Sequence, residues 1–246
     1  MILEGKKIMV IGASRGIGSA IAHGCALEGA CVVLVGRNQN TLEEVASELR
    51  SDTSVLVSTL AWDVSEVDLG PEVIKAAADI MGGLDVIIHN AGVIDHEPLL
   101  HVTEKEWDKL FDINVKGAYF CIQSAINYYL ENKEKNDRGI RGKIIVVSSE
   151  TGNQPHPKPY GVSKWAVMGM CKGFAKAFFM VVIICCCCMS VSAFAQTSSN
   201  DGGSFTAYYS IQSSYMIWIP EDVSLNQQNY LKAELLNITA DEQIVQ

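Results

Sequence analysis

The sequence is poor in positive charge. Its 246 residues include 19 Lys and Arg against 28 Asp and Glu, which gives a formal net charge of −9 at pH 7. An acidic chain lacks the basic surface that nucleic-acid binding requires, so we expect no nucleic-acid partner. Apolar residues make up 48% of the chain. That share excludes a disordered protein and supplies enough side chains for one large folded domain.

The sequence also lacks the spaced cysteine and histidine pairs of zinc sites. Its eight cysteines are Cys25, Cys31, Cys121, Cys171 and the run Cys185 to Cys188, and its five histidines are His23, His89, His96, His101 and His156. Neither set has ligand spacing, and four adjacent cysteines cannot surround one tetrahedral ion, so we expect no metal. Scattered single thiols are typical of the cytoplasm. The first residues contain no long apolar run, so we expect no signal peptide there.

Basic residues are nearly absent from the last 70 residues of the chain. Residues 177–246 hold 1 of the 19 basic residues and 6 of the 28 acidic ones. From Ala177 to Ala195 every residue except two serines is apolar, and the run ends in Ala-Phe-Ala. Three interpretations stay open: a buried helix, a membrane anchor that would make the protein membrane-associated, or a signal-like segment at the join of two unrelated coding sequences. We predict an apolar helix over 178–195 and an unrelated polar, partly β tail over 196–246.

Residues 1–177 alternate short β-branched runs with longer amphipathic segments, which is the pattern of repeated βαβ units. We expect strands at Lys7–Gly12, Cys31–Gly36, Ser54–Leu60, Leu84–His89 and Lys143–Ser148, and helices at Gly16–Glu28, Asn40–Arg50, Pro71–Met81, Glu104–Leu130 and Tyr160–Ala177. The strand candidates are apolar along nearly their whole length, as in a parallel sheet covered on both faces. The sequence therefore predicts an α/β domain over residues 1–177, with a doubly wound parallel sheet truncated after the fifth or sixth strand–helix pair. In the tail, Tyr215–Ile219 is a further strand candidate.

A glycine-rich turn follows the first expected strand. This turn, GASRGIG, comprises Gly12, Ser14, Arg15, Gly16, Ile17 and Gly18 among its residues. Strand, glycine turn and helix in this order are typical of a dinucleotide site, because glycine lets the backbone approach a pyrophosphate at the helix N-terminus. A turn that uses glycine for packing alone is the competing interpretation.

The end of the second expected strand distinguishes between the two nicotinamide coenzymes. An acid there would bind the ribose 2′-hydroxyl of NAD. The sequence has Arg37 and Asn38 instead, and Arg15 lies in the glycine turn. Two guanidinium groups can clamp a 2′-phosphate, so we predict NADP(H) in preference to NAD(H). Arg37 as an ordinary solvated residue is the alternative.

Further motifs follow in order along the chain. They are Asn90-Ala91-Gly92 after the fourth expected strand, Asn114 within DINVKG, Ser149 after the fifth strand, and Tyr160 with Lys164 at the start of the last helix. Together with the glycine turn, this series resembles the short-chain dehydrogenase/reductase family over residues 5–177. The resemblance implies a Rossmann fold and an enzyme that interconverts carbonyls and alcohols with a nicotinamide coenzyme.

The spacing of Tyr160 and Lys164 supports acid–base chemistry. Residues four apart share one face of a helix, so the Lys164 ammonium can stabilise the phenolate that forms when Tyr160 releases its proton. The resemblance implies that Lys164 also binds the nicotinamide ribose and that Ser149 holds the substrate oxygen. It further implies that Asn114 positions a water in a proton relay.

The same resemblance assigns Asp63 and Val64 to the adenine ring and Asn90, Ala91 and Gly92 to the wall beside the coenzyme. His156, in the loop before Tyr160, is a candidate for the substrate pocket. The implied partner is a small carbonyl or alcohol, and a homo-oligomer formed through the long helices is a candidate assembly. The competing function is a truncated dinucleotide-binding module with little or no turnover, because the pattern of the family after Lys164 is not recognisable.

Overall fold

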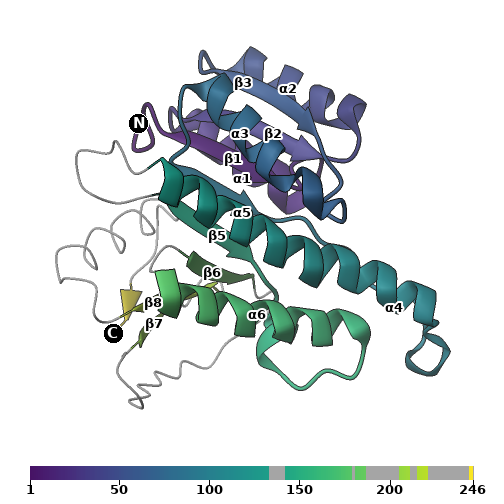
Figure 1. The fold of residues 1–246 in the computed structure, drawn as a ribbon. Coiled ribbons are helices and arrows are strands. Elements are labelled where there is room, and N and C mark those ends of the chain that lie inside the picture. Colours follow the sequence, from purple (N-terminus) through teal and green to yellow (C-terminus); the bar gives the residue numbers. More distant parts are fainter. Residues whose placement is uncertain (133–141, 179–180, 187–204, 211–214, 221–243, 246) are drawn as a thin grey trace.

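Strands and helices alternate along most of the chain (Figure 1). The computed structural model describes residues 1–132, 142–178, 181–186, 205–210, 215–220 and 244–245. The strands are β1 Lys7–Ile11, β2 Cys31–Gly36, β3 Val57–Ala61, β4 Val86–His89, β5 Lys143–Val147, β6 Val181–Cys186, β7 Phe205–Ser210, β8 Tyr215–Pro220 and β9 Ile244–Val245. The α-helices are α1 Gly16–Leu27, α2 Gln39–Asp52, α3 Gly70–Met81, α4 Glu104–Phe111, α5 Ala118–Glu131 and α6 Pro159–Phe178.

The strands form one sheet in the order β3-β2-β1-β4-β5-β6-β8-β7-β9. From β3 to β6 every neighbouring pair is parallel, whereas β8 is antiparallel to β6 and β7 is antiparallel to β8 and β9. The order 3-2-1-4-5-6 is that of a Rossmann fold, in which the strand order reverses between β1 and β4. The predicted α/β fold with a doubly wound parallel sheet is thus confirmed, and the candidate strand at Tyr215–Ile219 corresponds to β8.

Strand β6 contradicts part of the prediction for residues 178–195. Val181–Cys186 pairs in parallel with β5, so the predicted apolar helix is wrong over these residues. A short apolar run does not distinguish a buried strand from a buried helix, and the β-branched sequence VVII favours the strand. Residues 187–195 of the predicted helix lie outside the described residues. The boundary at residue 177 and the join of two coding sequences remain predictions.

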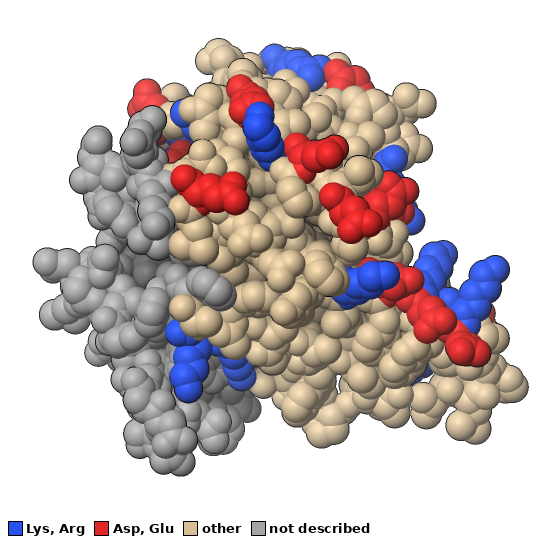
Figure 2. All heavy atoms as spheres, viewed as in Figure 1, with Lys and Arg blue, Asp and Glu red and all other residues tan. Residues whose placement is uncertain are grey.

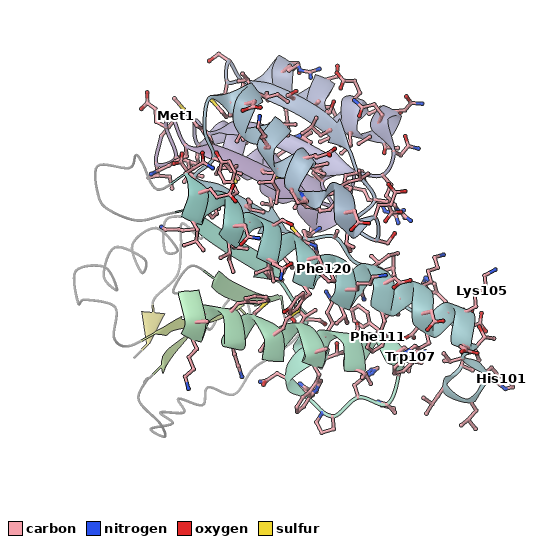
Figure 3. The ribbon with its side chains drawn as sticks, viewed as in Figure 1. Met1, His101, Lys105, Trp107, Phe111 and Phe120 are labelled. Atoms are coloured by element: carbon pink, nitrogen blue, oxygen red, sulfur yellow. The ribbon has the colours of Figure 1, made fainter. Side chains whose placement is uncertain are left out.

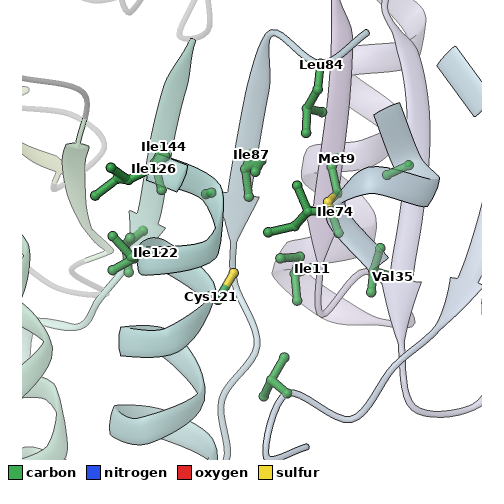
Figure 4. Packing of buried hydrophobic residues seen from close by; sticks show 14 of the residues in the cluster. Met9, Ile11, Val35, Ile74, Leu84, Ile87, Cys121, Ile122, Ile126 and Ile144 are labelled. Atoms are coloured by element: carbon green, nitrogen blue, oxygen red, sulfur yellow. The ribbon is translucent and has the colours of Figure 1, made fainter. Parts of the chain in front are cut away.

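Helices cover both faces of the parallel strands. One face packs against α1 and α2, and the other packs against α3, α5 and α6. On the second face, Ile126 of α5 lies beside Ile144 of β5, and Ile74 of α3 lies beside Met9 of β1 (Figure 4). These side chains are almost fully buried, so removal of apolar surface from water stabilises the layered arrangement.

The helix predicted over Glu104–Leu130 is interrupted. Residues Asp112–Gly117 form a π-helical segment between α4 and α5. Such segments are rare and are frequent at functional sites, because the extra residue displaces the backbone that follows. This one contains Asn114.

Among the residues that the structure describes, none of the helices combines the length and the apolar character needed to cross a bilayer.

Candidate active site

The candidate site lies at the carboxyl ends of the parallel strands, near β1 and β4, between which the strand order reverses. Five of the six buried polar residues of the described chain gather there: His89, Asn114, Ser148, Ser163 and Lys164. Burial of polar groups is costly unless they are hydrogen-bonded, so such a cluster within an apolar core marks a functional site.

The glycine turn after β1 contacts the segment after β4. Gly12 has a φ of 83°, and a Cβ there would lie 2.7 Å from the main chain of Ala91. A Cβ on Gly18 would overlap the carbonyl oxygen of Gly12 and lie 2.7 Å from Asn90 Nδ2. Asn90 Nδ2 donates a hydrogen bond to that same oxygen at 3.2 Å. Only glycine fits these two positions.

The N-terminus of α1, which follows the glycine turn, is open to solvent. Arg15, Gly16 and Ile17 are exposed, whereas Ser14 is half-buried beside Gly36. The exposed main-chain N–H groups and the helix dipole form a ready site for an anion. The turn therefore fits the pyrophosphate of a dinucleotide.

A cavity of about 540 Å³ adjoins the ends of β2 and β3. Its lining consists of Arg37, Asp63, Ser65, Glu104, Lys105, Asp108, Lys109, Asp112 and Ile113. This volume is in the range of small-molecule sites. The structure thus brings the predicted residues Arg37 and Asp63 together, and it adds Ser65 and the lysines of α4, which the motif pattern did not reveal.

Arg37 and Asp63 form a long ion pair in this cavity. Arg37 Nη1 lies 3.9 Å from Asp63 Oδ2, and more than half of the Arg37 side chain is exposed. The other oxygen of Asp63 accepts hydrogen bonds from the main-chain N–H and the hydroxyl of Ser65. Val64 is buried, and its carbonyl oxygen would lie 2.7 Å from a Cβ on Gly117. Because more than half of the Arg37 side chain is exposed, its guanidinium group can reach an anionic ligand.

Asn38, predicted to bind the coenzyme, also has a structural role as a helix cap. Its side-chain oxygen accepts hydrogen bonds from the N–H groups of Asn40 and Thr41, so Asn38 caps α2. Capping by asparagine stabilises a helix by about 1 kcal/mol.

Tyr160 and Lys164 lie on the first turns of α6. Lys164 Nζ is buried, 5.7 Å from the centre of the Tyr160 ring and 3.4 Å from the carbonyl oxygen of Val147. A Cβ on Gly92 would lie 3.6 Å from Lys164 Nζ and 3.3 Å from Asn114 Oδ1. The structure thus brings Gly92, Asn114 and Lys164 to one place.

Ser149 begins a short 3-10 turn, Glu150–Asn153, that packs on α6. A Cβ on Gly152 would lie 2.8 Å from the carbonyl oxygen of Lys164. Ser149 Oγ accepts hydrogen bonds from the hydroxyl and the main-chain N–H of Thr151, at 3.0 and 3.4 Å. Because both contacts use its acceptor capacity, Ser149 keeps its own hydrogen to donate to a ligand oxygen.

The Asn114 side chain joins three segments. Its Oδ1 accepts the Val93 N–H at 2.8 Å, and its Nδ2 donates to the Val93 carbonyl at 2.8 Å and to Ser163 Oγ at 3.1 Å. Both hydrogens of the amide are therefore in use. A water bound to Asn114 has to use the main-chain carbonyl or the second lone pair of Oδ1.

Two further residues were not predicted as part of the site. His89 is buried at the end of β4, and among the described residues its Nε2 has no hydrogen-bond partner. Burial, together with the charge of Lys164, lowers the pKa of His89 to about 4, so the ring is neutral at pH 7. Asp95 contacts the start of α6 from the segment after β4. Neither residue has a local motif, and only the folded arrangement reveals them.

His156 lies beside the first turn of α6. A Cβ on Gly161 would overlap its ring, and its Nδ1 accepts the Lys158 N–H at 3.3 Å. Its place in the substrate pocket remains a prediction.

Comparisons with known proteins agree with this geometry. A family model described as short chain dehydrogenase matches residues 6–202. The chain is 35% identical over 175 residues to a gluconate 5-dehydrogenase of Gluconobacter oxydans, an alignment that covers 70% of this chain but only 65% of that relative.

Two solved structures are also similar. An alcohol dehydrogenase from the archaeon Thermococcus sibiricus, complexed with 5-hydroxy-NADP, has a TM-score of 0.65 and 26% identity, with 73% of this chain and 74% of that one covered. A short-chain type dehydrogenase/reductase from Mycobacterium marinum has a TM-score of 0.65 and 27% identity, with 71% and 70% covered.

The glycine turn predicts a sharp contrast within α1. Gly18→Ala places a Cβ on the Gly12 carbonyl, so we expect a loss of about 1–3 kcal/mol in the free energy of unfolding and weaker NADPH binding by at least about tenfold. Gly24→Ala is the matched control, since a Cβ there meets nothing within 4 Å. We expect it to gain about 0.5–1 kcal/mol and to leave binding unchanged. Urea unfolding and NADPH fluorescence titration measure both; equal effects of the two substitutions would contradict the close approach.

The buried His89 predicts a pH dependence of stability. The unfolded chain binds a proton at this residue near pH 6.5, whereas the folded chain does so only near pH 4. The free energy of unfolding should therefore fall as the pH drops through this window, by about 3 kcal/mol from His89 alone. His89→Asn removes this contribution, whereas His101→Asn, at an exposed position, keeps it. If the free energies of unfolding of the wild type and His89→Asn fall in parallel between pH 7 and pH 4, burial does not lower the pKa of His89.

Proposed function

Because the chain belongs to the short-chain dehydrogenase family, we propose that it is an NADP(H)-dependent oxidoreductase that interconverts a small carbonyl compound and an alcohol. The observation that carries the proposal is the buried Lys164 ammonium, 5.7 Å from the Tyr160 ring and close to both Gly92 and Asn114. An ammonium in this position stabilises negative charge on the Tyr160 oxygen.

The chain's own residues handle the proton and the substrate oxygen. The bound coenzyme supplies or accepts the hydride at the carbon atom. During reduction Tyr160 gives its hydroxyl proton to the carbonyl oxygen, and Ser149 donates a hydrogen bond to the same oxygen. Lys164 balances the charge left on Tyr160. Asn114 holds the water from which Tyr160 regains its proton, and in oxidation the proton moves in the opposite direction.

The remaining predicted residues have roles in coenzyme binding. The turn from Gly12 to Gly18 would receive the pyrophosphate, and Asp63 and Val64 would contact the adenine ring. Arg37 and Arg15 would hold the 2′-phosphate. The exposed guanidinium of Arg37 in a cavity of suitable size supports this assignment, and the similar structure from Thermococcus sibiricus is complexed with 5-hydroxy-NADP.

An uncharged face over α5 and α6 supports self-association. Figure 2 shows few charged side chains there. Tyr119, Phe120 and Trp165 are 40%, 37% and 51% exposed, and Trp107 stacks on Phe111 nearby (Figure 3). Exposed apolar patches of this kind mark protein interfaces. We therefore propose a homo-oligomer formed through these helices, which the molar mass in solution tests. A cytoplasmic location, supported by the free thiols of Cys25, Cys31 and Cys121 in the described part of the chain, is part of the proposal.

A test of the reaction starts from a panel of substrates. Aldehydes and ketones are offered with NADPH, and alcohols, gluconate included, are offered with NADP⁺. We expect Tyr160→Phe to lower kcat by at least about 100-fold, because general acid–base catalysis contributes that much, and to leave the NADPH Kd within about threefold. Tyr128→Phe removes a hydroxyl from α5 and is the control. Coenzyme binding by the wild type without turnover on any substrate would favour the truncated binding module instead.

The coenzyme preference is tested at Arg37. Hydrogen bonds to charged groups contribute about 1.5–3 kcal/mol, so Arg37→Ala should weaken NADPH binding about 10- to 100-fold and leave NADH binding nearly unchanged. Arg50→Ala removes an exposed cation at the opposite end of β3, where Arg50 donates to the carbonyl oxygen of Val57, and serves as control. Tighter binding of NADH than of NADPH by the wild type would overturn the preference.

A further inference from the structure

Asp95 connects the segment after β4 to the first turn of α6, which carries Tyr160. Its Oδ2 accepts the Tyr160 main-chain N–H at 2.8 Å, across 65 positions of sequence, and its Oδ1 lies 3.3 Å from Lys158 Nζ. The carboxylate is 7% exposed. We propose that Asp95 is the positioning residue for Tyr160, a role that rests on the proposed function of Tyr160 as the acid–base group.

The start of α6 lacks a cap of its own. The helix begins at Pro159, and the Lys158 carbonyl accepts the first helical hydrogen bond, from Val162 at 3.1 Å, so Lys158 occupies the capping position. A lysine side chain has only donors and cannot accept a hydrogen bond from the helix. Pro159 has no N–H, which makes the Tyr160 N–H the first donor of α6 without an acceptor inside the helix. Asp95 supplies the missing acceptor from another part of the fold.

The charge of Asp95 suits this place in two ways. A carboxylate at a helix N-terminus interacts favourably with the helix dipole. Its other oxygen pairs with Lys158, so the nearly buried charge is compensated. A hydrogen bond to a charged acceptor is stronger and shorter than one to a neutral group, which makes the contact a firm constraint on the Tyr160 backbone.

The segment that carries Asp95 is itself held at two other points. The Asn90 side chain donates a hydrogen bond to the Gly12 carbonyl, and the main chain of Val93 forms two hydrogen bonds with the Asn114 side chain. Asn90, Val93 and Asp95 therefore link the glycine turn, the π-helical segment and the start of α6 in sequence. Through this short path the position of Tyr160 is set relative to the wall of the proposed coenzyme site. Displacement of a catalytic group by about 1 Å can cost about 100-fold in rate.

The experiment compares three variants by kcat, by NADPH Kd and by amide hydrogen exchange at Tyr160. Asp95→Ala removes the acceptor, so we expect kcat on the best carbonyl of the panel to fall at least about tenfold while the NADPH Kd stays within about threefold. Asp95→Asn keeps a side-chain oxygen in the same place and should restore most of kcat. Exchange of the Tyr160 amide, measured without coenzyme, should quicken at least about tenfold in Asp95→Ala and much less in Asp95→Asn.

Thr53→Ala provides the matched control. The Thr53 hydroxyl donates a hydrogen bond to the Leu49 carbonyl at the C-terminus of α2, so its loss destabilises a helix end outside the site. We expect destabilisation in both Thr53→Ala and Asp95→Ala but a fall in kcat only in the latter. The proposal is overturned if Asp95→Ala retains wild-type kcat or wild-type exchange at Tyr160, or if Thr53→Ala loses as much kcat. Full activity of Tyr160→Phe would instead refute the proposed function, while the exchange rates would still decide whether Asp95 holds the Tyr160 backbone.

Discussion

The double hydrogen bond between the Asn114 side chain and the main chain of Val93 is the contact on which the rest of the site depends. Asn114 is buried, and its third hydrogen bond, to Ser163, reaches α6. One amide thus fixes the segment after β4 against two helices. Because that segment also contacts Gly12, the glycine turn and the helix of Tyr160 share a single rigid support. Loss of this support would move both halves of the site together.

The middle of the sheet and the carboxyl ends of its strands are stabilised by different interactions. Across its middle, apolar residues such as Ile87 and Ile144 are almost fully buried, and hydrophobic packing stabilises the layers. At the carboxyl ends of the strands, buried polar groups replace them. His89 remains neutral there because burial and the charge of Lys164 lower its pKa. A protein retains such costly groups where their positions serve binding or catalysis.

The fold of residues 1–177 could be predicted because each parallel strand is a continuous apolar run followed by a turn and an amphipathic helix. The same signal failed at Val181–Cys186, where the length of the surrounding apolar run suggested a helix and hid a β-branched strand. The π-helical segment at Asn114 has no sequence pattern that separates it from an ordinary helix. The motifs of the site were recognisable because they are local, whereas the contact between Asp95 and Tyr160 joins residues far apart in sequence and depends on the completed fold.

The proposed function requires that this chain carries out hydride transfer and does not merely bind a dinucleotide. The most direct measurement uses NADPH with deuterium at the transferring position of C4 and analyses the alcohol product by mass spectrometry and NMR. We expect one deuterium on the carbon that was the carbonyl carbon, because the hydride passes directly between coenzyme and substrate. Binding of NADPH with no labelled alcohol from any carbonyl of the panel would contradict the claim.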